Sequence, residues 1–262
     1  MGASRDGLSY WLAASDGAVF ALDAAVHPRP AGRRFATKAR PLEVLITGDS
    51  LAVALQDGLD TGLRATRRAE AIRRGRWCYG LTASWEPSPP NPFCQAFSFY
   101  APSMLTDEIA TYDPDAVVLM LGTWDWQGRR VGSRVLTPPS GPWWRWYERI
   151  IDDAFRRLTS KGAIVYWVGY AACDGGTQTD FERTLNATAR RAAWRNPTRA
   201  VYLDLHAEVC PNGPIRNLGR LPDGRRVVLL DQTGHFSETG AEYTGRWITE
   251  ELAPTFRLPS HD

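Results

Sequence analysis

Short apolar runs alternate with longer amphipathic stretches through most of this sequence. The apolar runs are nearly continuous, which is typical of strands buried on both faces of a parallel sheet, and they cover residues 43–47, 116–121, 163–168 and 200–205. The amphipathic stretches predict helices at residues 51–59, 140–162, 179–196 and 237–252. This alternation predicts an α/β fold with three layers, in which helices cover both faces of a doubly wound parallel sheet.

The first 41 residues follow a different pattern. Two apolar runs flank Asp16-Gly17, a residue pair that accepts positive φ at both positions of a two-residue turn, so this segment predicts a β-hairpin. Residues 27–41 contain three prolines and no periodic pattern, which indicates an irregular linker. We therefore expect an N-terminal hairpin and linker over residues 1–41 and a main domain over residues 42–262.

Basic and acidic residues are mixed along the chain and nearly balance. The chain has 31 lysines and arginines against 29 aspartates and glutamates, which gives a formal charge of +2. Nucleic-acid binding needs a concentrated basic face, so we do not expect a nucleic-acid partner. Every apolar run stays well below the roughly 18 residues of a membrane span, so we expect no transmembrane segment in this chain.

A serine stands where the first strand of the main domain meets the first predicted helix. Gly48-Asp49-Ser50 directly follows that strand, and such a turn lies at the carboxyl edge of a parallel sheet, where open α/β folds bind their ligands. The N–H groups and dipole of a helix N-terminus favour a developing negative charge, which suits a nucleophile that attacks a carbonyl. The alternative is that Ser50 only caps the helix.

A serine hydroxyl needs a neighbouring base before it becomes a good nucleophile. The sequence has four histidines, at positions 27, 206, 235 and 261. His206 follows a predicted strand, but His235 is the better candidate because it precedes the last predicted helix and has Asp231 nearby to orient its ring. The alternative for His235 is a loop histidine without a catalytic role.

The four cysteines fall into two spaced pairs, Cys78 with Cys94 and Cys173 with Cys210. None has the Cys-x-x-Cys spacing of a zinc or redox site. Each lies in or beside a predicted loop at the carboxyl side of a strand, which favours two disulfides and an oxidising compartment. The alternative is four unrelated buried thiols.

Several of these motifs together resemble the SGNH (GDSL) hydrolase family over residues 42–252. They are Gly-Asp-Ser after the first strand, a lone glycine in the next block, a Gly-x-Asn-Asp-like block and an Asp-x-x-His-like block near the C-terminus. The resemblance implies a flavodoxin-like fold and acyl-ester chemistry that uses neither a metal nor an organic cofactor. It implies that Ser50 is the nucleophile, that the Ser50 and Gly80 N–H groups form the oxyanion hole and that His235 is the general base.

Two blocks depart from the family pattern. Trp124 stands where the family has an asparagine that donates to the oxyanion, and losing one such donor costs about a hundred- to a thousandfold in rate. Either the Trp124 indole N–H replaces it or another group does. Asp231 lies four residues before His235, and the usual spacing of three falls on Gln232; we favour Asp231 as the acid.

A narrower resemblance concerns substrate and location. Residues 112–126, the cysteines around Gly80 and residues 202–213 look like the extracytoplasmic SGNH domains of membrane acyltransferases that O-acetylate cell-surface glycans. This resemblance implies an esterase or O-acyltransferase acting on a carbohydrate, an extracytoplasmic or secreted location in a bacterium, and a membrane acyltransferase domain as a candidate acyl donor.

Aromatic residues cluster near the third motif block. Aromatic faces stack on sugar rings, so we expect Trp124, Asp125 and Trp126 to take part in substrate binding; simple packing is the alternative for the tryptophans. A second function from another class also fits the altered blocks, namely a non-catalytic glycan-binding module. We favour the enzyme because a serine nucleophile and a histidine base are both present.

Overall fold

The computed structural model describes residues 35–82, 102–126, 128–174 and 179–259, together with the backbone of three short strands near the N-terminus. A five-stranded sheet forms its centre, with the strand order β10-β9-β6-β4-β5 and every neighbouring pair parallel. These strands are β4 (Leu42–Gly48), β5 (Ala69–Gly75), β6 (Ala116–Met120), β9 (Ile164–Val168) and β10 (Ala200–Leu203). The parallel sheet predicted from the apolar runs is confirmed.

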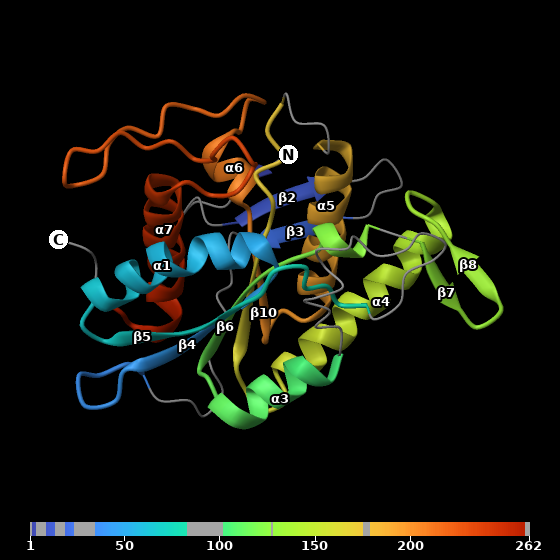
Figure 1. The fold of residues 1–262 in the computed structure, drawn as a ribbon, viewed down its shortest axis with the longest axis horizontal. Helices are drawn as coiled ribbons and strands as arrows, with labels where there is room; N and C mark the ends of the chain where they lie inside the picture. Colours follow the sequence, from blue (N-terminus) through green and yellow to red (C-terminus); the bar gives the residue numbers. More distant parts are fainter. Residues whose placement is uncertain are drawn as a thin grey trace.

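Helices cover both faces of this sheet (Figure 1). One face carries α1 (Ser50–Ala65) and α7 (Glu238–Phe256), whose apolar side chains share a core cluster with Val44 and Ile46. The other face carries α3 (Pro102–Tyr112), α4 (Gly141–Leu158) and α5 (Thr179–Arg195), whose cluster includes Leu45 between those two residues. Alternate side chains of one strand therefore pack into the cores on opposite faces of the sheet, which gives the three-layer α/β fold that we expected.

Smaller elements complete the main domain. A short helix, α6 (Leu205–Val209), follows β10 directly because Asp204 caps it and ends the strand. A single 3₁₀ turn (η1, Thr123–Asp125) follows β6, and two short antiparallel strands, β7 (Arg129–Val131) and β8 (Arg134–Leu136), form a ribbon that projects from the body (Figure 1). Within the described residues, no helix is long and apolar enough to cross a membrane.

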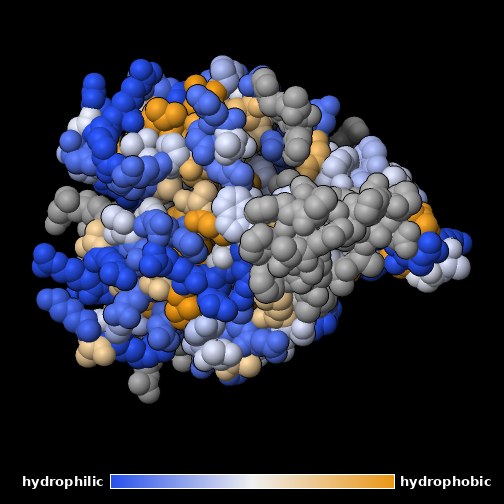
Figure 2. All heavy atoms as spheres, viewed as in Figure 1, coloured by the Kyte–Doolittle hydropathy of each residue, from blue (hydrophilic) through white to orange (hydrophobic). Residues whose placement is uncertain are grey.

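The sequence pattern did not predict β5, α3 or the β7–β8 ribbon. β5 is an edge strand whose sequence, AEAIRRG, carries charges among its apolar residues, so it lacks the continuous apolar run of the central strands. Figure 2 shows mostly hydrophilic side chains over the region of β5 and α1. The missing apolar run thus reflects the exposed position of this strand.

The N-terminal strands pair as the predicted hairpin requires. β2 (Ser9–Ala13) and β3 (Val19–Asp23) are antiparallel, with Ala13 opposite Val19, and a two-residue strand β1 (Gly2–Ala3) pairs with β2. The predicted turn at Asp16-Gly17 and most of the predicted linker lie outside the described residues.

Glycines allow α1 and α7 to pack in backbone contact. A Cβ on Gly245 of α7 would lie 2.4 Å from the carbonyl carbon of Gly58 in α1, and one on Gly62 would lie 2.8 Å from the Thr249 hydroxyl oxygen. No side chain fits between helices this close. This contact matters for function because α1 begins with Ser50 and α7 follows the loop that carries His235.

One predicted disulfide is confirmed. Cys173, in the loop after β9, is bonded to Cys210 at the end of α6. The other predicted pair, Cys78 with Cys94, lies outside the described residues because Cys94 does.

Candidate active site

The strand-to-turn junction places Ser50 at the carboxyl edge of the sheet. Gly48 ends β4 with a φ of +141°, and a Cβ there would lie 1.9 Å from the Met120 carbonyl oxygen, so only glycine fits. Asp49 is the N-cap of α1 and accepts a hydrogen bond from the Leu51 N–H, which makes Ser50 the first helical residue. Ser50 therefore does not cap the helix, and the alternative reading of this serine is wrong.

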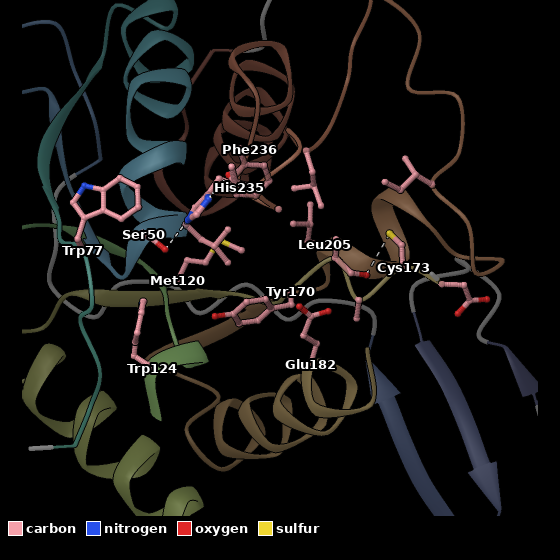
Figure 3. Close-up of a pocket in the computed structure, with 18 residues that line it drawn as sticks. Ser50, Trp77, Met120, Trp124, Tyr170, Cys173, Glu182, Leu205, His235 and Phe236 are labelled. Atoms are coloured by element: carbon pink, nitrogen blue, oxygen red, sulfur yellow. Dashed lines mark hydrogen bonds between the residues drawn. The ribbon is translucent and has the colours of Figure 1, made fainter. Parts of the chain in front are cut away.

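Ser50 and His235 are in hydrogen-bond contact. Their side chains come from positions 185 residues apart, and His235 Nε2 lies 2.9 Å from Ser50 Oγ (Figure 3). Ser50 is largely buried, with 8% of its surface exposed, whereas His235 is half-buried. His206, the alternative histidine, instead directs Nδ1 to the Ala171 carbonyl oxygen. The nucleophile–base pair expected from the sequence is thus assembled in the fold.

A threonine connects His235 to Asp231. Thr233 Oγ1 lies 2.8 Å from His235 Nδ1, and the Thr233 hydroxyl donates to Asp231 Oδ1 at 2.6 Å. Because the single hydroxyl proton goes to Asp231, the threonine oxygen is left to accept the proton on Nδ1. Nε2 then carries the lone pair that faces Ser50, which is the tautomer that a general base needs.

Asp231 orients this loop without touching the imidazole. Its Oδ1 also accepts from the backbone N–H groups of Thr233, at 2.8 Å, and His235, at 3.2 Å. The hydrogen bond from the Thr233 hydroxyl is the main cause that lowers the pKa of Asp231 below its usual value. Gln232 is exposed and forms no hydrogen bond with His235 in the described structure. Sequence reasoning missed Thr233, since no motif spacing marks it.

Asp125 lies behind the site rather than in it. It is fully buried and accepts hydrogen bonds from the N–H groups of Leu81 (2.9 Å) and Thr82 (3.1 Å) and from the Tyr147 hydroxyl (2.8 Å). Burial raises its pKa, and the Leu81 N–H is the largest opposing influence. The expectation that Asp125 binds substrate is therefore corrected: its carboxylate is already occupied in holding residues 81–82.

Gly80 lies against that carboxylate. A Cβ on Gly80 would come within 2.7 Å of Asp125 Oδ1, so the close approach of this loop requires glycine. Gly80 is buried, and no hydrogen bond engages its N–H within the described structure. Its assignment to an oxyanion hole stays a prediction.

Asp49 is a second buried carboxyl group near the nucleophile. It accepts from the Leu51 N–H at 2.9 Å and from the Tyr170 hydroxyl at 3.3 Å. Burial is the dominant influence on its pKa, which it raises to about 7. A negative charge beside Ser50 is therefore avoided over much of the acidic pH range.

A cavity of about 560 Å³ opens beside the Ser50–His235 pair, a volume typical of small-ligand sites. In the view of Figure 3, Trp77 and Trp124 lie to the left of the pair and Cys173 lies toward the other end. The Trp77 ring contacts the His235 ring edge-on at 5.4 Å, and Trp77 is 43% exposed. Sequence reasoning missed Trp77 because it follows β5, the edge strand that the sequence pattern did not predict.

Trp126 does not line this cavity. Its ring packs against Phe181, with ring centres 4.1 Å apart, and against Trp143 and Trp144. The expected role of Trp126 in substrate binding is thus replaced by packing in the aromatic cluster between α4 and α5, whereas Trp124 does line the cavity.

Comparisons with known proteins extend this picture. A family model described as "Protein of unknown function (DUF459)" matches residues 43–251. No curated protein matches the sequence. Among solved structures, a lipase/acylhydrolase from Enterococcus faecalis is similar, with a TM-score of 0.53 and 17% identity, over 85% of this chain and 99% of the other.

Two further structures are similar. LAE5, an alpha/beta hydrolase enzyme from the metagenome of Lake Arreo, has a TM-score of 0.51 and 14% identity, over 84% of this chain and 98% of the other. The C-terminal catalytic domain of peptidoglycan O-acetyltransferase A from Streptococcus pneumoniae has a TM-score of 0.47 and 15% identity, over 84% of this chain and 97% of the other. The two structures with TM-scores above 0.5 establish the fold, which is that of the SGNH hydrolases.

Proposed function

Because this chain belongs to the family of proteins of unknown function named DUF459, and its SGNH-type fold brings Ser50 and His235 within 2.9 Å, we propose that it is a serine-dependent acyl-ester enzyme. That hydrogen bond carries the proposal. A serine at a helix N-terminus, faced by the unprotonated nitrogen of a histidine, is the arrangement that acyl transfer through an acyl-enzyme requires.

In the proposed reaction, Ser50 Oγ attacks the ester carbonyl while His235 Nε2 takes its proton. The imidazolium that forms keeps its Nδ1–H on Thr233, whose hydroxyl donates to the Asp231 carboxylate. The Ser50 N–H at the start of α1 and the Gly80 N–H would stabilise the oxyanion, with Trp124 in the position of the family asparagine. His235 then returns the proton to the leaving alcohol, and water or a sugar hydroxyl releases the acyl group from Ser50.

We infer that the substrate is an O-acylated carbohydrate. Trp77 and Trp124 both line the cavity beside the serine, and aromatic faces of this kind stack well on sugar rings. The Cys173–Cys210 disulfide supports an extracytoplasmic location. In that location, a membrane acyltransferase domain would supply the acyl group, and the enzyme would then transfer it to a glycan.

Labelling with a fluorophosphonate tests this proposal without knowledge of the substrate. Intact mass should reveal one adduct on the wild-type chain and none on Ser50→Ala or His235→Ala, because both the nucleophile and its base are needed. Circular dichroism of each variant serves as the folding control. If the folded wild type took up no fluorophosphonate, the proposal that this chain is a serine-dependent enzyme would be refuted.

A glycan-binding module without chemistry is the second candidate. It is favoured by one observation, that Trp124 occupies the position of an oxyanion donor in the family. Under this alternative, the fluorophosphonate leaves the wild type unmodified, and acetylated oligosaccharides perturb the fluorescence of Trp77 and Trp124 without losing acetate.

A further inference from the structure

Glu182 is a carboxylate on the wall of the cavity that holds Ser50 and His235. It lies in the first turn of α5, and Figure 3 shows its side chain pointing from that helix into the cavity, between Tyr170 and Cys173. It is half-buried, and no hydrogen bond or ion pair engages it in the described structure. Burial alone raises its pKa.

The described residues around Glu182 offer it no free positive charge. Asp174 lines the same part of the cavity, but the Arg183 guanidinium pairs with it. Among the described residues that line the cavity, none is a lysine or an arginine, and many are apolar, including Met120 and Leu205. The cavity therefore has an acceptor-only, negatively charged group away from its serine.

Helix capping does not explain this carboxylate. A carboxylate at an N-cap accepts hydrogen bonds from the free backbone N–H groups of the first turn, as Asp49 and Asp204 do for α1 and α6. Glu182 lies within the first turn of the 17-residue helix α5 and makes no such bond. A half-buried carboxylate without a partner is unfavourable. A ligand that donates hydrogen bonds to Glu182 would therefore bind more tightly.

We propose that Glu182 selects the substrate: it accepts hydrogen bonds from hydroxyl or ammonium groups on the part of the ester that extends toward α5, and it excludes esters with a carboxylate or phosphate there. This inference rests on the proposed function. It narrows the substrate class to neutral or amino sugars and their relatives, and excludes acidic glycans.

Three methyl glycosides test the inference, those of glucose, glucosamine and glucuronic acid, each with one acetyl group on the same hydroxyl. They differ in charge and little in shape. The wild type should release acetate from the glucose and glucosamine esters with a kcat/KM at least about tenfold above that for the glucuronate ester, since like charges in a desolvated site repel strongly. Glu182→Gln should remove most of that preference.

Asp180→Asn is the matched control. Asp180 lies in the same turn of α5, is exposed and does not line the cavity, so this variant removes the same charge and should keep the wild-type preference. Asp180→Asn should also hydrolyse 4-nitrophenyl acetate at the wild-type rate, and Glu182→Gln should stay active on this ester, which offers Glu182 neither a negative charge nor a hydroxyl or ammonium donor. Glu182→Gln should have a Tm at neutral pH that is no lower than that of the wild type, because it breaks no contact and removes a partly desolvated charge.

The outcomes separate the two claims. Equal discrimination by the wild type and Glu182→Gln, with normal turnover of 4-nitrophenyl acetate, would overturn the role of Glu182 and leave the esterase standing. If the wild type hydrolysed the glucuronate ester with the same kcat/KM as the other two esters, the role of Glu182 would also be overturned. A wild type inactive on every ester would refute the proposed function itself, and the inference with it.

Discussion

Replacing Gly245 by alanine should push α1 and α7 apart and separate the two candidate catalytic residues. The added Cβ would lie 2.4 Å from the carbonyl carbon of Gly58 and 2.5 Å from the Leu59 nitrogen. Both are backbone atoms, so no side chain can rotate away. Ordinary contacts start near 3.4 Å, and relief therefore needs a shift of about 1 Å between the helices.

The size of the effect follows from that shift. Overpacking of this kind costs about 1 to 3 kcal/mol of unfolding free energy, and each kcal/mol lowers Tm by about 2 to 4 °C in a chain of this length. His235 reaches Ser50 across the same helix pair at 2.9 Å. Since a 1 Å misplacement can cost about a hundredfold in rate, the labelling of Ser50 by a fluorophosphonate should slow by about that factor.

Thermal unfolding and the rate of fluorophosphonate labelling measure the two effects separately. Gly141→Ala is the matched control, because the nearest atom to its new Cβ is on the flexible Arg145 guanidinium, at 3.4 Å; it should keep both the wild-type Tm and the labelling rate. If Gly245→Ala behaved like this control, α1 and α7 would not be in backbone contact, and the link between their packing and the site would be refuted.

Two further predictions concern Asp49 and Thr233. Burial raises the pKa of Asp49 to about 7, so the folded protein loses stability as pH rises from about 4, where the unfolded chain ionises this group, to about 7. Asp49→Asn keeps a capping oxygen, and its Tm relative to wild type should increase between pH 5 and pH 8; a difference independent of pH would contradict this. Thr233→Val removes the hydroxyl between Asp231 and His235 and should slow labelling by about ten- to a hundredfold, since a hydrogen bond to a charged group contributes about 1.5 to 3 kcal/mol. Its Tm should fall only slightly, because Thr233 and Asp231 are both exposed. Thr233→Ser should restore the rate, and equal rates for valine and threonine would exclude the hydroxyl from the site.

The central strands were predictable from sequence because their burial leaves a direct mark. β4, β6, β9 and β10 lie between two helical layers, so their positions are nearly all apolar. β5 lies at the edge of the sheet, and its charged residues interrupt the apolar run by which a strand is predicted. The predicted helix at residues 51–59 is longer in the structure, because α1 continues to Ala65 along α7.

The site was predictable where a motif fixes both residue type and chain position. Ser50 and His235 are of this kind, and the structure places them in contact. The sequence does not reveal on which side of the backbone a side chain lies, so Asp125 was assigned to the cavity although it points into the core. Thr233 and Glu182 escaped detection because their roles depend on loop shape and on the absence of partners, which only coordinates reveal.

Because of the Cys173–Cys210 disulfide, the two ends of the cavity are held in place by different means. The end with Ser50 and His235 depends on the packing of α1 against α7, whereas the opposite wall, which includes Cys173, is fastened covalently to α6. Reducing agents therefore act on one part and spare the other. A preparation kept under thiol reductants retains its nucleophile and base but has a looser wall beyond them, so its reactivity toward small reagents is a poor guide to its choice among larger substrates.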